Sequence, residues 1–238
     1  MLFFYIRHGD PIYNPDSLTP LGEYQAEAVK NRLGQFGLDK IYASSSNRAI
    51  QTATPTAKML KKDIEILDWC NEAHAWNELT VKNEQGNDTW LYCHTKSRID
   101  FVSEEMRALG KKWYEHPSYT KESYRTGTLR IKEETEKLLA AHGYRHDDKR
   151  NLYIGEKPSD ERVALFAHEG FGLMFLSCLL DIPYPEFCTH FTMQHTGITV
   201  IEFPNVAGEI IPTVLQLSND SHLFADRLPL KYHNRIYF

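Results

Sequence analysis

The chain has 238 residues, of which 42% are hydrophobic and 25% charged, and its formal net charge is -5. This composition is typical of a globular protein with one sizeable core. The acidic balance gives no basic footprint for nucleic acid, although a local cationic pocket for an anionic substrate is still compatible with it. No apolar stretch reaches the roughly 20 residues of a membrane span, so we expect no membrane partner.

The four cysteines are sparse and form no C-x-x-C pair, which favours reduced thiols over a disulfide framework. The first residues lack the basic and apolar regions of a secretory signal. These features predict a cytoplasmic protein. Nothing in the sequence indicates its oligomeric state.

The first predicted element is a strand at residues 2–6, an apolar and aromatic run typical of a strand buried on both faces. Thr19 and Pro20 suit the N-cap and the first position of a helix, which we expect to end near Gly34. Residues 40–43 indicate a second strand.

A second helix is expected from Ser46 or Asn47 to Leu60. Strands and helices that alternate in this way indicate a parallel α/β sheet. The later predicted elements are strands at 64–67 and 163–167, a helix at about 171–180, and strands at 197–203 and 213–217 joined by a turn around 205–208.

The pattern changes between about residues 73 and 160, where apolar residues recur at helical spacing. The recurring residues are Ile99, Val102, Met106, Leu109 and Trp113, and then Leu129, Ile131, Thr135 and Leu138. We interpret this segment as a helical insertion packed over the sheet. The sequence therefore predicts a single domain over residues 1–238.

Polar residues follow three of the predicted strands. Arg7, His8 and Gly9 end the first strand, and ligands of open α/β sheets bind where strands end. Arg48 would lie in the first turn of a helix, beside free backbone N–H groups that favour phosphate. His168 ends another buried strand. Each feature alone is equally compatible with an exposed strand end, a surface arginine or a structural histidine, but together they favour an anion site.

The motifs resemble those of the histidine phosphatase superfamily, also called the phosphoglycerate mutase-like family. They are Arg-His-Gly at residues 7–9, "LTPLGEYQA" at 18–26, "SSSNRAIQTA" at 44–53 and His-x-Gly from His168. The insertion carries no matching motif. The resemblance implies a three-layer α/β/α sandwich with a mostly parallel central sheet and the helical insertion over the active site.

The resemblance also implies roles for individual residues. His8 matches the nucleophile, which takes the phosphoryl group as a phosphohistidine. Glu72 matches the proton donor, with Asp10 and Glu78 as alternatives. The residues expected to hold the phosphoryl oxygens are Arg7, Asn14, Arg48 and His168. Ser45, Ser46 and Glu169 depart from the family pattern, and the carboxylate of Glu169 could repel phosphate or tune the second histidine.

The chemistry is consistent with these roles. Phosphoryl transfer spreads negative charge over three oxygens, which arginine binds bidentately. The nucleophilic imidazole must be neutral, and flanking arginines lower its pKa. No metal or other cofactor is required. We therefore predict a hydrolase of small phosphorylated metabolites, with a phosphoglycerate mutase and a non-catalytic phosphoester-binding module as alternatives.

Other polar and aromatic groups are open to two interpretations. The segment "HGYRHDD" at 142–148 could bind a metal through its histidines and aspartates, but we expect a solvated loop. His190 and His195 show no metal-ligand spacing and are expected in the core or at the surface. Five aromatic residues of the insertion could line a substrate pocket or form the insertion's own core: Trp76, Trp90, Tyr92, Trp113 and Tyr114. For Trp113 we favour the core.

Overall fold

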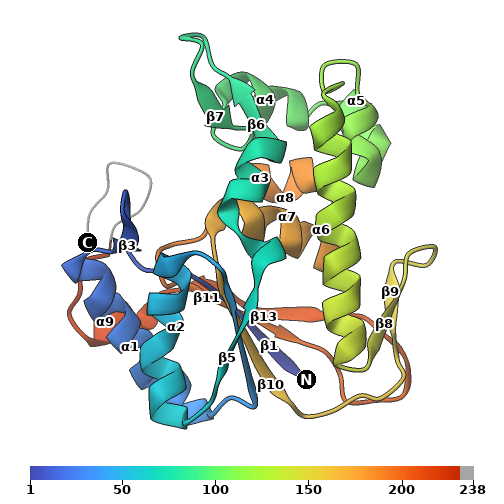
Figure 1. The fold of residues 1–238 in the computed structure, drawn as a ribbon. Coiled ribbons are helices and arrows are strands. Elements are labelled where there is room, and N and C mark those ends of the chain that lie inside the picture. Colours follow the sequence, from blue (N-terminus) through green and yellow to red (C-terminus); the bar gives the residue numbers. More distant parts are fainter. Residues whose placement is uncertain (231–238) are drawn as a thin grey trace.

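The computed structural model describes residues 1–230. Its main sheet has six strands in the order β13-β11-β1-β10-β4-β5 (Figure 1). Neighbouring strands are parallel from β1 to β5 and antiparallel between β1, β11 and β13. The strand bounds are Leu2–Arg7 (β1), Lys40–Ser44 (β4), Ile64–Leu67 (β5), Arg162–Ala167 (β10), Ile198–Glu202 (β11) and Thr213–Asn219 (β13). The sheet is thus mostly parallel, as predicted.

One face of the sheet is covered by α1 (Pro20–Phe36) and α2 (Asn47–Leu60), with the short α9 (Ser221–Ala225) beside α1. Thr19 caps α1 by accepting a hydrogen bond from the Gly22 backbone N–H. The helix was predicted to end near Gly34, but it continues to Phe36. A Cβ at residue 34 would lie 2.6 Å from the Met59 sulfur, so this glycine allows α1 to pack closely on α2.

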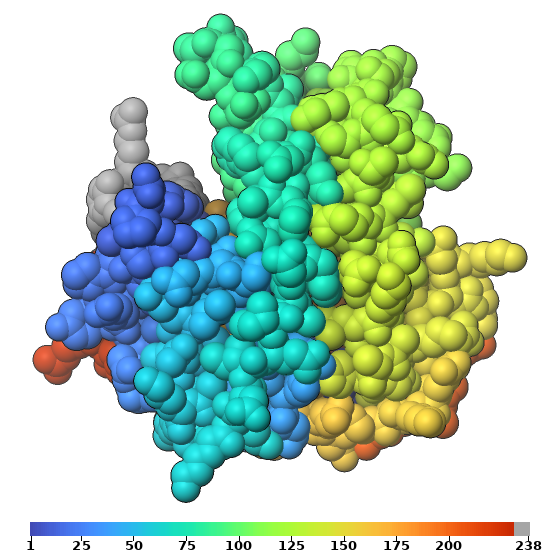
Figure 2. Space-filling view, viewed as in Figure 1, coloured from blue at the N-terminus to red at the C-terminus, as the bar shows by residue number. Residues whose placement is uncertain are grey.

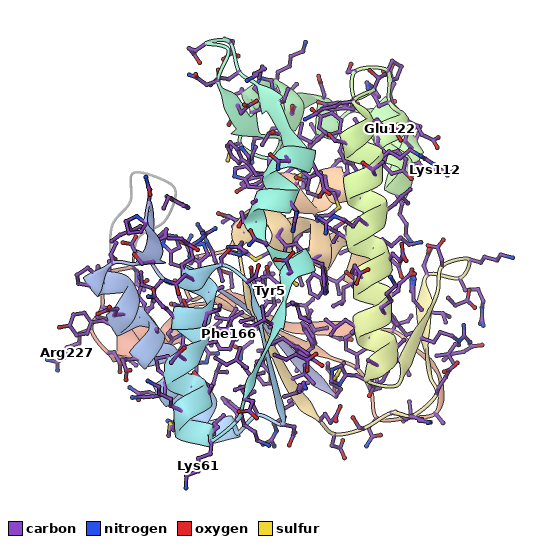
Figure 3. The ribbon with its side chains drawn as sticks, viewed as in Figure 1. Tyr5, Lys61, Lys112, Glu122, Phe166 and Arg227 are labelled. Atoms are coloured by element: carbon purple, nitrogen blue, oxygen red, sulfur yellow. The ribbon has the colours of Figure 1, made fainter. Side chains whose placement is uncertain are left out.

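The other face carries α7 (Glu169–Leu180), α6 (Glu122–Ala141) and α3 (Glu72–Leu79), with α8 (Tyr184–His190) against α7. Helix α7 begins about one half-turn before its expected start and is buried along almost all of its length. Tyr5 and Phe166, labelled in Figure 3, belong to the two separate hydrophobic cores on the opposite faces of the sheet. The observed architecture is therefore a mixed α/β sandwich with helices on both faces.

The segment at 73–160 is not purely helical, and this corrects the prediction. Besides α3 and α6 it contains α4 (Thr95–Phe101), α5 (Glu104–Leu109) and a 3₁₀-helix (Gly110–Glu115). It also contains two hairpins, β6 (Thr80–Lys82) with β7 (Asp88–Trp90) and β8 (Tyr144–Asp147) with β9 (Leu152–Gly155). The first turn is closed by the Asn83 side chain, which accepts hydrogen bonds from the backbone of Gln85 and Asn87.

The chain between the last two long strands is also more structured than the predicted turn. Residues Gly208–Ile210 form β12, which pairs with β9 of the insertion. A small hairpin of β2 (Pro11–Tyr13) and β3 (Asp16–Leu18) follows β1, and a 3₁₀-helix (Asp68–Cys70) follows β5. These short elements carried too few residues for a periodic signal.

The insertion shares one hydrophobic core with the sheet. Trp113 and Ile131 of the insertion belong to the same buried cluster as Phe3, Val163 and Phe171. Figure 2 shows the yellow-green part of the insertion packed against teal residues, which in turn lie beside the blue N-terminal part of the chain. We therefore propose one domain, of which residues 231–238 lie outside the described part. No helix within residues 1–230 is long and apolar enough to cross a membrane.

Candidate active site

Three neighbouring parallel strands bring the candidate catalytic residues to one edge of the sheet. The register pairs Arg7 of β1 with Ala167 of β10, and Phe166 of β10 with Ala43 of β4. His8 and His168 therefore follow adjacent strands at the same level, and their ring centroids lie 5.2 Å apart. This is the position where open α/β sheets bind ligands.

His8 is only 2% exposed, and its Nδ1 lies 2.7 Å from the carbonyl oxygen of Gly9. Because a carbonyl can only accept, Nδ1 carries the proton and the lone pair of a neutral ring is at Nε2. Burial, and then the nearby His168 and Arg7, hold the pKa of His8 well below its usual value. The ring is therefore neutral and has a nucleophilic nitrogen at neutral pH.

Gly9 has a packing role at this point. A Cβ there would lie 2.7 Å from the backbone oxygen of Gly22 in α1, so a side chain at residue 9 would push the helix away from the loop that carries His8. The glycine thus fixes how closely α1 approaches the strand end that carries His8.

Arg7 is buried and forms an ion pair with Glu169, with 2.8 Å between its Nη1 and the carboxylate. Its Nη1 also donates to the backbone oxygen of Met193 at 2.5 Å. Glu169 in turn accepts hydrogen bonds from the Thr192 hydroxyl and the Met193 backbone N–H. The acid that departs from the family pattern is therefore the direct partner of a candidate phosphate-binding arginine.

Arg48 lies in the first turn of α2 and is held from three sides. Its Nη1 donates to Asp16 at 2.6 Å, its Nη2 lies 3.3 Å from Nδ1 of His168, and its guanidinium carbon lies 5.3 Å from the Tyr13 ring centroid. Its buried Nε has no hydrogen-bond partner within residues 1–230. A buried donor of this kind is costly unless a ligand accepts from it.

His168 is fully buried, and its Nε2 lies 2.8 Å from the hydroxyl oxygen of Ser44. Because the guanidinium of Arg48 can only donate, Nδ1 accepts and Nε2 carries the proton. Burial and then the charges of Arg48 and Arg7 keep the pKa of His168 well below its usual value. Both histidines of the site are consequently neutral.

Glu72 begins α3 and accepts a hydrogen bond from the Phe171 backbone N–H at 3.0 Å. Its other carboxylate oxygen lies 3.2 Å from Nδ1 of His168. Burial raises the pKa of Glu72 to about 7 although nearby arginines oppose this. A carboxyl group with this pKa can both donate and accept a proton near neutral pH.

The two alternative carboxylates are placed elsewhere. Asp10 accepts a hydrogen bond from the Thr19 hydroxyl at 2.7 Å, and Glu78 forms an ion pair with Arg130 at 2.6 Å. Neither residue lines the cavity that contains His8. Asp10 also lies 3.6 Å from Nδ1 of His195, but of the three candidates only Glu72 lines the cavity and contacts His168.

A cavity of about 580 Å³ opens at this edge of the sheet. Its lining residues are Arg7, His8, Tyr13, Asp16, Ser46, Arg48, Asn71, Glu72, Ala73, Trp76, Trp90, Tyr92, Glu169 and Gly170. Asn14, which was expected to line the pocket, is instead exposed in the β2–β3 turn. Asp16 of the same hairpin occupies the cavity wall, and no sequence pattern distinguished it beforehand.

His195 was expected only as a core or surface residue, yet its ring centroid lies 5.6 Å from that of His8. It precedes β11, which pairs with β1. The backbone N–H of Thr196 donates to the carbonyl oxygens of Arg7 and His8 and so fixes this neighbouring loop. A pairing between distant strands brings it here, and the sequence carries no local sign of that pairing.

The segment at 142–148 was expected to be a solvated loop, and the structure corrects this expectation. His146 lies in β8 with its side chain 2% exposed, between Glu136 at 2.8 Å and Asp181 at 3.0 Å. Lys132 contacts Asp148 at 2.8 Å. These lysine and carboxylate contacts account for the charges of the segment without a metal ion.

Within residues 1–230, two groups of side chains have ligand atoms close enough together for a metal ion. One consists of His8, Glu72 and His168, and the other of Glu136, His146 and Asp148. The guanidinium groups of Arg7 and Arg48 beside the first group, and Lys132 beside the second, oppose the binding of a further cation.

The chain belongs to the histidine phosphatase superfamily, branch 1, whose family model matches residues 3–211. This match covers both histidines, both arginines and all of the insertion. A comparison with curated proteins found no match.

Solved structures of similar fold include three phosphatases. One is the phosphoserine phosphatase of Entamoeba histolytica with 3-phosphoglyceric acid, at 19% identity and a TM-score of 0.58, covering 93% of this chain and 98% of that chain. Another is mycobacterial glucosyl-3-phosphoglycerate phosphatase, at 20% identity and a TM-score of 0.57, covering 91% of this chain and 98% of that chain. The third is the α-ribazole phosphatase of Shigella flexneri, at 18% identity and a TM-score of 0.58, covering 92% of this chain and 97% of that chain. At these identities the likeness establishes the shared fold.

Proposed function

We propose that this protein is a metal-independent phosphomonoester hydrolase that acts on a small phosphorylated metabolite through a phosphohistidine at His8. The observation that supports this best is the neutral, buried His8 ring in a cavity that also contains two arginines and a carboxyl group with a pKa of about 7. The phosphatase names of the structural neighbours are consistent with it.

In the first half-reaction, Nε2 of His8 attacks the phosphorus atom while the bond from phosphorus to the leaving oxygen breaks. Arg7 and Arg48 would hold the equatorial oxygens, where negative charge is spread, and His168 would position Arg48 by accepting the hydrogen bond of its Nη2. Protonated Glu72 would give its proton to the leaving oxygen, so an alcohol departs and not an alkoxide. The hydrogen bond from Nδ1 to Gly9 supports the positive charge that develops on the ring.

In the second half-reaction, the Glu72 carboxylate would take a proton from water as the water oxygen attacks phosphorus. The bond between Nε2 of His8 and phosphorus then breaks, inorganic phosphate is released, and Glu72 is again protonated. The same groups thus return to their initial states after each cycle. Transfer to water and not to a second hydroxyl distinguishes this proposal from a mutase.

Hydrolysis of p-nitrophenyl phosphate with and without EDTA tests the proposal. We expect turnover that EDTA does not reduce, that is lost in His8→Ala, and that persists in His74→Ala, an exposed histidine on α3. Loss of turnover with EDTA, restored by a divalent cation, would contradict metal independence. Turnover that persists in His8→Ala would contradict the assigned nucleophile.

The two alternative functions are separated by further assays of the same protein. Interconversion of 3- and 2-phosphoglycerate with a bisphosphoglycerate primer would indicate a mutase. Phosphate binding without turnover, unchanged in His8→Ala, would indicate a binding module. The proposal of a cytoplasmic site of action is supported by the sparse cysteines, all four of which are free thiols in the structure, and fractionation of the native source would test it.

A further inference from the structure

The cavity around His8 continues beyond the space that a phosphoryl group needs. A second hollow of about 710 Å³ shares five lining residues with it: Arg7, Tyr13, Trp90, Tyr92 and Glu169. Either volume falls in the range that accommodates a small organic ligand. The extension therefore has room for the alcohol part of the substrate.

Aromatic rings from three elements line the two hollows. Trp76 of α3 and Trp90 of β7 form a right-angled corner, with centroids 5.0 Å apart and an interplanar angle of 86°. Tyr92 follows with its ring centroid 5.7 Å from that of Trp90, at 27°. Tyr13 of the β2–β3 hairpin contributes a further ring that is 69% exposed. Such corners and exposed faces accommodate a flat ring by stacking or edge-to-face contact.

The aromatic corner lies directly beside the proposed proton donor. A Cβ on Gly170 would lie 2.6 Å both from Oε1 of Glu72 and from the Trp90 ring, so the missing side chain lets the carboxyl and the indole share one space. Trp76 is also four residues after Glu72 and therefore on the same face of α3. An alcohol that takes the Glu72 proton would thus contact these rings.

The charges of the lining disfavour a second anionic group on the leaving alcohol. Within residues 1–230, the permanently positive residues that line the two hollows are Arg7, Arg48 and Arg98. The first two face the phosphoryl position and are paired with Glu169 and Asp16. Arg98 donates to the backbone oxygens of Tyr92 and Thr189, both at 3.0 Å. A carboxylate on the leaving alcohol would therefore meet Glu72 and Glu169, while Arg7 and Arg48 are already paired with carboxylates and the guanidinium of Arg98 is held by two backbone oxygens.

We propose that the aromatic corner of Trp76, Trp90 and Tyr92 is a leaving-group subsite for phosphomonoesters of ring-bearing alcohols that carry no anionic group. This rests on the proposed function and adds the class of substrate to it. It predicts discrimination against carboxylated phosphoesters of the kind named in two of the similar structures.

The test compares three esters of primary alcohols: ethyl phosphate, benzyl phosphate and 4-carboxybenzyl phosphate. Because these alcohols leave with similar ease, differences in kcat/KM report contacts of the alcohol. We expect benzyl phosphate to exceed ethyl phosphate and 4-carboxybenzyl phosphate by about tenfold or more. Trp76→Ala should lower the value for benzyl phosphate about tenfold and leave that for ethyl phosphate almost unchanged.

Phe224→Ala, at an exposed ring of α9 remote from the cavity, serves as the matched control and should change neither value. Equal kcat/KM for the three esters, or equal losses for ethyl and benzyl phosphate in Trp76→Ala, would overturn the inference while the hydrolase function stands. If no ester is hydrolysed, the hydrolase function fails. Calorimetry with ethylphosphonate and benzylphosphonate then decides the subsite alone: tighter binding of the ring, lost in Trp76→Ala, supports it, and equal binding overturns it.

Discussion

Two buried histidine clusters lie at the two ends of the same helix, α7, and the charged groups around the two histidines have opposite sign. His168 is the N-cap residue of the helix, and burial together with two arginines lowers its pKa. His146 contacts Asp181, the C-cap residue. There burial opposes protonation, but the hydrogen bonds to Asp181 and Glu136 outweigh it and raise the pKa of His146.

The comparison shows that burial alone does not determine the state of an imidazole. The positive end of the helix dipole and the arginines keep His168 and its neighbour His8 neutral, whereas the negative end and two carboxylates favour a charged His146. Neutral rings suit nucleophilic chemistry. A charged ring between two carboxylates suits a structural link between β8, α6 and α7.

The largest effect is expected for the nucleophile. His8→Ala should lower kcat/KM about 10³-fold or more, because no other group described in the cavity can take the place of Nε2 of His8 in forming the proposed covalent intermediate. The free energy of unfolding, measured by urea titration, should change little. A variant that keeps more than a tenth of the activity would show that His8 is not the nucleophile.

The next effect concerns the proton donor. Glu72→Gln should lower kcat for benzyl phosphate about 10²- to 10⁴-fold. In the wild type, kcat/KM should fall as pH rises through about 7. The reason is that the pKa of Glu72 in the substrate-free protein is raised to about 7 and the acid form is required. On the acid side the rate should hold to well below pH 6.5, because the pKa of His8 is lowered. A profile that is flat from pH 6 to 9 would contradict the role of Glu72.

The same raised pKa affects stability in a defined direction. Below the pKa of 4.5 that Glu72 has in the unfolded chain, the carboxyl is protonated in both the folded and the unfolded protein. As pH rises from 4.5 to about 7, the unfolded chain ionises before the folded protein does, so the free energy of unfolding decreases. Glu72→Gln should therefore be stabilised relative to wild type at pH 8 but not at pH 4, as measured by thermal unfolding. Destabilisation at pH 8 would show that the charge is compensated in the folded protein.

The cluster at the other end of α7 should respond in stability and not in catalysis. His146→Gln should lower the free energy of unfolding by about 3 kcal/mol at pH 6, because it leaves two carboxylates without their shared cation. The contribution is present below the unfolded pKa of about 6.5 and is lost as pH rises through the raised folded pKa. Chemical denaturation at pH 6 and pH 9 measures the difference, and an equal loss at both pH values would contradict a charged His146.

The smallest predicted effect is at Glu169. Its carboxylate shares Arg7 with the incoming phosphoryl group, so Glu169→Gln should tighten the binding of inorganic phosphate by about threefold to tenfold in calorimetry. Thr192→Val, which removes only the hydrogen bond to that carboxylate, is the matched control and should change the affinity less. Weaker binding in Glu169→Gln would show instead that Glu169 is needed to orient Arg7.

The two clusters also differ in how far the sequence could predict them. Arg7, His8, Arg48 and His168 all follow strands or begin helices with clear patterns, so their meeting at one sheet edge was predictable from topology. His146, by contrast, follows a long helix in a polar segment. Its burial depends on Asp181, which is 35 residues away and carries no local signal.

The insertion shows the same limit at larger scale. Its long helix α6 was visible from periodicity, whereas the β6–β7 hairpin, which ends at Trp90, has strands of three residues each. Such strands are stabilised by tertiary contacts and not by local propensity. Asn14 was predicted from the resemblance alone, and the hairpin geometry places Asp16 in the cavity in its stead.

The most direct test of the central claim is to trap the covalent intermediate. Wild-type protein mixed rapidly with a phosphoester and quenched in alkaline denaturant, which preserves phosphohistidine, should gain the mass of one phosphoryl group on the peptide that contains His8. The same experiment with Glu72→Gln should increase the trapped fraction if water attack slows more than phosphoryl transfer to His8. Steady turnover without any phosphoryl group on His8, or with the group on another residue, would contradict the account.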